Sequence, residues 1–435
     1  MTVKFSCMEQ VAAFINTQSY RQALARLCRL AGHSTSDGRR VLDDWEKHHE
    51  EDEQVLMDTI DRIESIDNKE STITSEEVNN DPLLWLRALD DFCVRINPKS
   101  YGYLRNSRID DGEGQVWMLP IYQKSESCGG GKRLQFGNIA YWLKHYRVVP
   151  HNNPQKIPVN VVGIPRGYHD WLANHFSATT IRIAVVHFDD GVRPNVSDKK
   201  PSHFICKEIS DTETRFASAL HHISEAKKRK AHILVMPELT ITPDIRSRIV
   251  SELQQLHRKN GEKHSLSVPL IVLGSFHEQV EKGWRNHAEA MLGLDGTLLF
   301  GCDKRKSVTF NKRKEGIECA PNHFTCLFTP LGLMAMAICK DFFEGEPAMV
   351  LASLPLDWLL VPSMTDKLNP HKATAKTMHD TLGTIVAVAN QELPAGLTPV
   401  RGFVQHQKFV ECKEDLVIVS VTRDEFDHFT LVDLS

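Results

Sequence analysis

From residue 180 onward, short apolar segments recur at regular intervals with helical segments between them, and this alternation constrains the fold more than any other feature. Residues 181–188 form a β-branched run of strand length, and Ser210 with Glu213 fits the capping box of a following helix. Further strands are predicted at 232–236, 270–275, 288–292, 298–301, 333–338, 358–361, 385–389 and 416–421, with helices near 347–354 and 371–382. Many short apolar strands with interleaved helices predict a layered α/β domain over residues 180–435, with helices covering its sheets.

The first 97 residues have a helical pattern instead. Residues 8–31 and about 39–66 place apolar side chains on one helical face, and a third helix is predicted to begin at Pro82. Asp and Glu are concentrated between 43 and 91, which we interpret as a solvated helical face rather than a site for a basic partner. We therefore expect a mostly helical region over residues 1–97.

Residues 98–179 are rich in Tyr, Trp, Arg and Lys and are interrupted by Gly. Aromatic rings beside cations can stack on bases and bind phosphates, which would suit a nucleic-acid partner. The alternative is that the aromatic residues form a small core. The Gly-Gly-Gly-Lys stretch at 129–132 lacks the spacing of a phosphate-binding loop, so we interpret it as a turn. We expect a small α+β connecting segment here, and a nucleic-acid or protein partner of residues 1–179 remains open.

Compartment and cofactor expectations follow from what the sequence contains. No stretch reaches the ~18 uninterrupted apolar residues of a membrane helix, and the N-terminus lacks the apolar core of a secretory signal, so we expect a cytoplasmic protein without a membrane partner. The ten cysteines are scattered without a C-x-x-C pair, which predicts reduced thiols. The His-His-Glu-Glu stretch at 48–51 lacks further ligand spacing, so we predict no metal site there. One of the thiols is then a candidate nucleophile.

Three polar residues stand at or just beyond the ends of predicted strands: Glu238, Lys304 and Cys339. A thiol attacks as its thiolate and therefore needs a base and a nearby cation. Glu238 could accept the thiol proton and later activate water, while the Lys304 ammonium would stabilise the anionic tetrahedral intermediate. Together the three residues are sufficient for acyl transfer without an imidazole.

These segments resemble the nitrilase superfamily of carbon-nitrogen hydrolases, which use a Glu-Lys-Cys triad. The family's strand-Pro-Glu element resembles residues 235–238, its turn-strand-Lys element resembles 295–304, and its Gly-led strand ending in Cys-x-Asp resembles 332–341. Lesser matches occur in the same order at Gly274-Ser275, Asn286, Pro362-Ser363 and Ala389-Asn390. The resemblance covers about residues 180–435. It implies a four-layer αββα sandwich, a catalytic triad without metal or organic cofactor, and a homodimer or other homo-oligomer.

Two assignments within the triad region have competitors. The family often has a second glutamate beyond its lysine, and Glu315 and Glu318 both fit that place. Lys306 competes with Lys304 because the two would share a face of a continuing strand, and only the spacing from Gly296 favours Lys304.

Further candidates for supporting roles are Lys340, Asp341, Asn286 and Ser363. Lys340 stands where the family often has an aromatic residue after its nucleophile. An extra cation there would lower the pKa of Cys339 or select an acidic substrate.

The sequence thus predicts a thiol-dependent hydrolase of a non-peptide carbon-nitrogen bond in a small-molecule amide, carbamoyl compound or nitrile. The reaction would pass through a Cys339 thioester. The alternative is a nitrilase-like binding or effector module in a bacterial defence or signalling assembly, antiviral defence included, with the N-terminal region as its docking element. That alternative rests on analogy, because a fold does not determine a function.

Overall fold

The computed structural model of the chain describes residues 2–32, 53–69, 71–96, 108–110, 114–120, 145–151, 157–178, 180–200, 202–260, 268–281, 283–310, 312–318, 323–391 and 401–422. The chain divides into two compact units, Met1–Asn153 with Asp427–Ser435, and Pro154–Phe426. Residues 48–51 and 129–132 and most of the aromatic and basic side chains of 98–144 lie outside the described residues. Within the described part, no helix combines the length and apolar character needed to cross a membrane.

The N-terminal unit combines helices with a small antiparallel sheet. Its elements are α1 (Thr2–Asn16), α2 (Tyr20–Gly32), α4 (Glu53–Asp67), α5 (Ser75–Asn80), α6 (Pro82–Ile96), β1 (Arg108–Asp110), β2 (Gln115–Pro120) and β3 (Tyr146–Pro150). Helix α5 begins with a capping box between Thr74 and Glu77. The Asp90 carboxylate accepts the backbone N–H groups of His145 and Tyr146, at 2.9 and 3.0 Å, and so joins α6 to β3. Tyr146 is buried at this junction.

The C-terminal unit contains two large mixed sheets. One has the order β11-β10-β9-β8-β5-β20 and the other β19-β18-β17-β16-β15-β14-β4. The strands of the first sheet are β5 (Thr180–Val186), β8 (Ile233–Val235), β9 (Leu270–Val280), β10 (Gly283–Leu292), β11 (Leu298–Asp303) and β20 (Leu416–Thr422). Those of the second are β4 (Val159–Gly163), β14 (Phe324–Thr329), β15 (Gly332–Met336), β16 (Trp358–Met364), β17 (Ile385–Gln391), β18 (Gly402–Gln405) and β19 (Phe409–Glu411).

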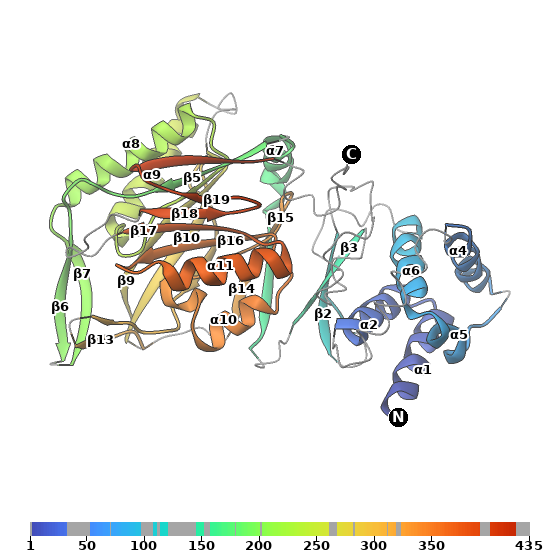
Figure 1. Cartoon of the computed structure of the whole chain (residues 1–435). Coiled ribbons are helices and arrows are strands. Elements are labelled where there is room, and N and C mark those ends of the chain that lie inside the picture. The colour runs from blue at the N-terminus through green and yellow to red at the C-terminus, as the bar shows by residue number, and fades with distance from the viewer. Residues whose placement is uncertain are drawn as a thin grey trace. The chain divides into compact units, whose positions relative to one another are not determined.

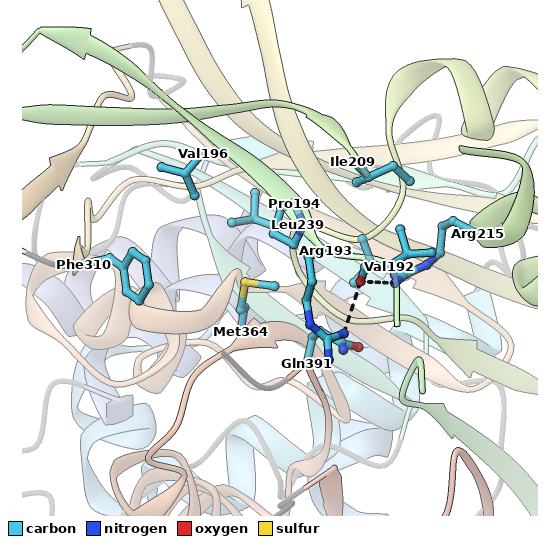
Figure 2. Close-up of a pocket in the computed structure, with 11 residues that line it drawn as sticks. Val192, Arg193, Pro194, Val196, Ile209, Arg215, Leu239, Phe310, Met364 and Gln391 are labelled. Carbon is cyan, nitrogen blue, oxygen red and sulfur yellow. Dashed lines mark hydrogen bonds between the residues drawn. The ribbon is translucent and has the colours of Figure 1, made fainter. Parts of the chain in front are cut away.

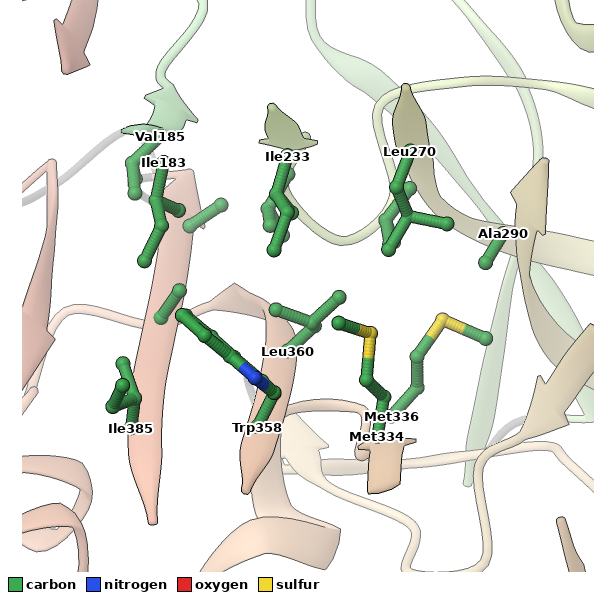
Figure 3. Packing of buried hydrophobic residues seen from close by; sticks show 14 of the residues in the cluster. Ile183, Val185, Ile233, Leu270, Ala290, Met334, Met336, Trp358, Leu360 and Ile385 are labelled. Atoms are coloured by element: carbon green, nitrogen blue, oxygen red, sulfur yellow. The ribbon is translucent and has the colours of Figure 1, made fainter. Parts of the chain in front are cut away.

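The main core lies between these two sheets. Figure 3 shows Ile183, Ile233 and Leu270 of the first sheet facing Trp358 and Met334 of the second. These side chains belong to one cluster of buried residues, and the Trp358 indole N–H donates to Leu331 O at 3.0 Å. The central strands are parallel to one another and buried on both faces, which explains their almost continuous apolar sequences.

Helices cover the outer faces of both sheets (Figure 1). Helices α8 (Thr212–Lys228) and α9 (Pro243–Asn260) bury apolar residues against the side of the first sheet that turns away from the main core. Because side chains alternate along a strand, Ile183 faces the other sheet while Ala184 faces these helices. On the second sheet, α11 (Asn369–Leu382) packs against β17 and β18, and α10 (Gly345–Ala352) follows the 3-10 helix η6 (Cys339–Phe342). The mixed α/β prediction is confirmed.

The C-terminal unit begins at Pro154, before the expected start at residue 180 and inside the segment 98–179. Two elements explain this difference. Strand β4 pairs in parallel with β14, far along the chain, and α7 (Arg166–Phe176) buries Leu172 and Phe176 in the main core. Pairing between strands this distant in sequence leaves no signal in the local composition.

A smaller sheet in the order β12-β13-β7-β6 completes the unit. Its strands are β6 (Pro194–Lys200), β7 (His203–Ile209), β12 (Thr309–Phe310) and β13 (Arg313–Glu315). The helix that follows β7 has Asp211 as its N-cap, accepting from Thr214 N, and not the predicted Ser210. Ser210 Oγ instead accepts the backbone N–H of Arg193 at 3.0 Å, which ties the end of β7 to the start of β6.

Candidate active site

Glu238, Lys304 and Cys339 are distant in sequence but meet at the ends of three strands. Glu238 follows β8, Lys304 directly follows β11, and Cys339 opens η6 just beyond β15. Only 1%, 1% and 4% of their surfaces are exposed. Lys304 Nζ donates to Glu238 Oε1 at 2.6 Å. In such a dry environment each charge acts more strongly on its neighbours than it would in water.

The structure distinguishes the two competing lysines. Lys304 bonds Glu238, whereas the Lys306 side chain lies over Gly345, where a Cβ would stand 2.6 Å from Lys306 Cε. The backbone N–H of Lys306 donates to Asp341 Oδ1 at 2.6 Å. Lys304 is therefore the lysine that faces Glu238.

The structure also distinguishes the two candidates for the second glutamate. Glu315, on β13, reaches Lys304 Nζ with Oε2 at 2.9 Å and accepts the Asn286 amide on Oε1 at 3.0 Å. Glu318 instead lies against Gly283, where an added Cβ would stand 2.3 Å from its Oε2. The Asn286 amide also donates to Glu238 Oε1 at 2.9 Å, so Asn286 and Lys304 each bridge both carboxylates.

These charges set the protonation state of Lys304. Burial alone would lower the pKa of Lys304, but Glu238 and Glu315 outweigh it and hold that pKa well above its ordinary value. Burial would likewise raise the pKa of Glu315, but Lys304 and His277 outweigh it and hold the pKa below its ordinary value. The cluster therefore contains a permanent ammonium ion between carboxylates.

His277 is a member of this network that the sequence analysis missed. Its Nδ1 accepts the backbone N–H of Cys206 at 2.9 Å, and its Nε2 lies 2.9 Å from Glu315 Oε1. Because Nδ1 is an acceptor, the proton of the neutral ring is assigned to Nε2, which donates to Glu315. The available signal was its position on β9, two residues after Ser275 and so on the same face of the strand.

The Glu238 backbone is held at the meeting point of β9 and β16. Gly274 has a φ of +66°, and an added Cβ would lie 2.1 Å from Pro237 O, so this close approach requires glycine. Glu238 N donates to Ser363 O at 3.3 Å, and Met364 N donates to Glu238 Oε2 at 3.0 Å. The second carboxylate oxygen is thus fixed by the end of β16.

Cys339 has a left-handed backbone, with φ of +48°, where the chain turns from β15 into η6. Such a conformation is uncommon for a non-glycine residue and costs about 1–3 kcal/mol. Its Sγ lies 4.0 Å from Met364 O, and the neighbouring Ser363 hydroxyl acts to lower the pKa of the thiol. Burial and then Glu238 raise the pKa of Cys339 to about 12, against the opposing effect of Lys304, so the resting group is a thiol.

Ser363, next to this thiol, contacts a buried histidine. Ser363 Oγ lies 3.1 Å from His371 Nε2, and burial lowers the pKa of His371 to about 3. His371 is therefore neutral at physiological pH. The neutral imidazole therefore gives the Ser363 hydroxyl a hydrogen-bond partner without adding a charge beside the thiol.

Asp341 and Lys340, which follow the cysteine, have different surroundings. Asp341 accepts the backbone N–H groups of Arg305 and Lys306, at 2.7 and 2.6 Å, and so holds the loop directly after Lys304. Burial raises the pKa of Asp341 to about 7 in spite of these donors. Lys340 Nζ pairs with Glu344 at 3.0 Å on a partly exposed surface. This pairing partly compensates the Lys340 charge, which weakens the idea that Lys340 selects an acidic substrate.

No set of three or more His, Cys, Asp or Glu side chains in the described ranges has an arrangement suited to a metal ion.

No protein-family model and no curated protein matches the chain. Among solved structures, it is similar to Nit3 of Saccharomyces cerevisiae, a member of branch 10 of the nitrilase superfamily, at 16% identity over 58% of this chain and 93% of that chain, with a TM-score of 0.39. It is similar to an amidase from Nesterenkonia sp. at 14% identity over 57% of this chain and 92% of that one, with a TM-score of 0.37.

Two longer proteins are matched over part of their own length. The chain covers 46% of a glutamine-dependent NAD+ synthetase from Acinetobacter baumannii and 62% of the Caenorhabditis elegans NitFhit protein, at 17% identity to each, with 57% of this chain covered and TM-scores of 0.38. Over a little more than half of its length, the chain is similar to solved structures of the nitrilase superfamily.

Proposed function

We propose that this chain is a carbon-nitrogen hydrolase of the nitrilase type, which cleaves a non-peptide amide or related bond through a Cys339 thioester. One observation carries the proposal: a buried ammonium ion, Lys304, is clamped between Glu238 and Glu315 beside a cysteine held in a left-handed turn. In this view the two sheets and their outer helices are the αββα sandwich of that family, and a homodimer is the expected assembly.

The first half-reaction would begin with transfer of the Cys339 proton to Glu238 as Sγ attacks the substrate carbonyl carbon. A thiol whose pKa is about 12 is almost fully protonated at neutral pH, so proton removal and attack must be coupled. Carbonyl π electrons move to oxygen, and the Lys304 ammonium stabilises the resulting oxyanion. A single preorganised donor of this kind contributes about 10²–10³ in rate.

Collapse of the tetrahedral intermediate would break the carbon-nitrogen bond. The nitrogen leaves as ammonia or an amine with the proton that Glu238 took from the thiol, and the acyl group remains as a thioester on Sγ. Glu238 then accepts a proton from water, which attacks the thioester, and this proton returns to Sγ. The sum is amide plus water to carboxylic acid plus amine, with the enzyme unchanged.

The second carboxylate would keep this cycle electrically balanced. Lys304 stays protonated throughout because Glu315 remains ionised beside it when Glu238 takes up a proton. Without Glu315, protonation of Glu238 would leave a buried ammonium ion without a counter-charge. The Asn286 amide would hold both carboxylates in place during these changes.

The test is turnover with a panel of simple amides, carbamoyl compounds and nitriles, with the reaction divided between two quenches. We expect hydrolysis by the natural sequence, an acyl adduct on Cys339 in the intact mass after an acid quench, and loss of that adduct with release of acyl hydroxamate after a hydroxylamine quench. Cys339→Ala should abolish both adduct and turnover. Turnover that persists in Cys339→Ala would remove the nucleophile assignment, and absence of any adduct even with small electrophiles would favour a binding module.

A further inference from the structure

Two neighbouring residues at the end of β16 turn their side chains in opposite directions. Met364 lines a pocket that adjoins the candidate active site, together with Leu239 and Arg193 (Figure 2). The empty space of this pocket is about 480 Å³, with open solvent at its mouth included. Because side chains alternate along a strand, Ser363 points away from Met364, toward His371 of α11. A role for Ser363 would thus be exerted on the thiol and not on a molecule in the pocket.

The position of Ser363 is fixed by the backbone around it. Its carbonyl accepts the Glu238 N–H at 3.3 Å, and the next N–H along the strand, that of Met364, donates to Glu238 Oε2 at 3.0 Å. One residue further on, Thr365 exchanges two 3.0 Å hydrogen bonds with the Asn390 side chain. None of the Ser363 surface is exposed. Its hydroxyl is therefore held in a dry environment next to the thiol.

The His371 ring has one nitrogen with a hydrogen-bond partner and one without. Its Nε2 lies 3.1 Å from Ser363 Oγ, whereas no group within the described part of the chain makes a hydrogen bond to its Nδ1. The ring is fully buried, and the Phe343 and Phe342 ring centres lie 4.6 and 6.0 Å from its own. A buried N–H group without an acceptor is rare, and a buried acceptor without a donor is less so. The proton of the neutral ring is therefore assigned to Nε2.

This tautomer determines what the Ser363 hydroxyl can do. A hydroxyl has one proton to donate and accepts on its lone pairs. Because the His371 Nε2–H donates to Ser363 Oγ, the serine proton stays available for the neighbouring Cys339 sulfur. A hydrogen bond to an ionised acceptor is stronger than one to a neutral acceptor, so this proton favours the thiolate. In agreement, burial and Glu238 raise the pKa of Cys339, and the Ser363 hydroxyl acts in the opposite direction.

Resting on the proposed hydrolase function, we infer that Ser363 is a further catalytic residue, which donates a hydrogen bond to Cys339 Sγ whenever this sulfur is anionic. His371 is the positioning residue that orients the serine hydroxyl. The sulfur becomes anionic when Glu238 takes its proton for attack, and again when water has attacked the thioester and the carbon-sulfur bond breaks. In that second step the electron pair of the bond goes to Sγ, and Glu238 returns the proton. Ser363 and His371 keep their protons throughout, so they stabilise the negative charge without adding a cation that would compete with Lys304.

The test is the rate of Cys339 alkylation by iodoacetamide as a function of pH, without any amide present and with the modified peptide identified by mass spectrometry. Ser363→Ala should make alkylation at pH 9 about 3–10-fold slower, because the thiolate fraction falls by more than its nucleophilicity rises. Ser275→Ala is the matched control and should keep the natural rate. Ser275 is another buried serine, 1% exposed and bridged to Glu238, but its hydroxyl is not among the groups that act on the Cys339 pKa.

Variants of His371 test the direction of its hydrogen bond to Ser363. His371→Phe should slow alkylation less than Ser363→Ala does, because the serine proton keeps its acceptor but loses the donor that orients and polarises the hydroxyl. His371→Gln keeps an N–H donor and should recover most of the natural rate. If Ser363 instead donates to Nε2, His371→Phe frees the serine proton and alkylation becomes faster, which would overturn the inference.

Nitrogen-15 NMR of the histidine rings examines the same hydrogen bond in the natural sequence and needs no variant at Ser363. The His371 signal is identified by its absence from the spectrum of His371→Gln. We expect a protonated Nε2 and an unprotonated Nδ1. A proton on Nδ1 would overturn the inference.

Amide turnover separates this inference from the hydrolase proposal. If both are correct, Ser363→Ala lowers kcat by about tenfold with little change in KM, since the pocket keeps its lining. Alkylation that depends on Ser363, with no amide turnover by the natural sequence, would support the hydrogen bond to the sulfur and remove the hydrolase. Amide turnover with an alkylation profile that Ser363→Ala leaves unchanged would overturn the inference and keep the hydrolase.

Discussion

The cluster around Lys304 and the pocket that Arg193 lines lie next to each other in the C-terminal unit. Their charged groups differ in burial and in pairing. In the Lys304 cluster every charge is buried and paired, and each carboxylate oxygen of Glu238 and Glu315 has a donor. In the pocket, the Arg193 guanidinium is exposed and has no acidic partner among the described residues. A paired and dry charge is preorganised for a reaction, whereas an exposed and unpaired charge is available for a ligand.

The largest effect should come from removing the cation of the buried, paired cluster. Lys304→Met leaves Glu238 and Glu315 buried without their cation, so we expect kcat/KM to fall by more than about 10³ and the free energy of unfolding to fall by about 3–5 kcal/mol. Amide turnover and chemical denaturation measure the two losses.

Lys306→Met is the matched control for this change, since Lys306 lies two residues away and makes no ion pair with Glu238. It should retain most activity and stability. A Lys306→Met variant that loses as much activity as Lys304→Met would contradict the assignment of the ammonium to Lys304.

A smaller effect is expected from His277, a positioning residue that supports Glu315. His277→Phe removes the donor to Glu315 and the acceptor for Cys206 N, so we expect kcat to fall by about 10–100-fold with little change in KM. Steady-state kinetics with one amide separates the two constants. His277→Gln keeps a donor for Glu315 and should recover part of the loss. A change in KM alone would show that His277 acts on the pocket and not on the charge cluster.

The same contrast explains which residues sequence reasoning could find. Glu238, Lys304 and Cys339 each interrupt or end an apolar run, so a polar or reactive residue stands out where a strand presents it. The parallel order of β5, β8 and β9 in one sheet and of β15, β16 and β17 in the other places Glu238 and Cys339 at strand ends. Strand β11 pairs antiparallel with β10, which pairs antiparallel with β9, so β11 runs in the same direction as β9 and Lys304 also follows a strand end. Strand ends are therefore predictable site positions.

His277 and Arg193 could not be found in this way. His277 lies inside a strand, and only the pairing of β7 and β13 brings Glu315 to it. Arg193 lies before β6 in a stretch without periodicity. The Asp190 carboxylate, three residues before Arg193, accepts hydrogen bonds from Arg215 and not from Arg193. Which of several nearby charges a side chain pairs with depends on the three-dimensional structure, so sequence spacing does not reveal it.

The pH dependence of Cys339 alkylation tests how the buried charges act on the pKa of this thiol. Burial raises the pKa of Cys339 first, and Glu238 adds to it, to a value of about 12. The thiolate fraction therefore grows with pH, and alkylation of Cys339 by iodoacetamide should keep accelerating through pH 10. Glu238→Gln removes the second cause, so the pKa should fall and alkylation at pH 9 should become several-fold faster.

Peptide mass spectrometry resolves Cys339 from the other thiols in this experiment. Glu318→Gln removes a carboxylate that is not among the groups that raise the Cys339 pKa, and serves as the control. A plateau of the alkylation rate below pH 8 in the natural sequence would show that Lys304 stabilises a resting thiolate, against the neutral thiol assigned here.

The smallest effect is expected at Lys340, which tests whether closeness in sequence to the nucleophile matters. Its ammonium pairs with Glu344, four residues further along the chain, and 27% of the Lys340 side chain is exposed. Solvent screens a pair of this kind, so Lys340→Gln should lower the free energy of unfolding by less than about 1 kcal/mol. Denaturant titration at low and at high salt measures this, and the difference should shrink as salt is added. A loss several times larger that does not change with salt would mean that the Lys340 charge acts on the buried cluster. Lys340 would then belong with the buried cations such as Lys304 and not with the solvent-screened ones.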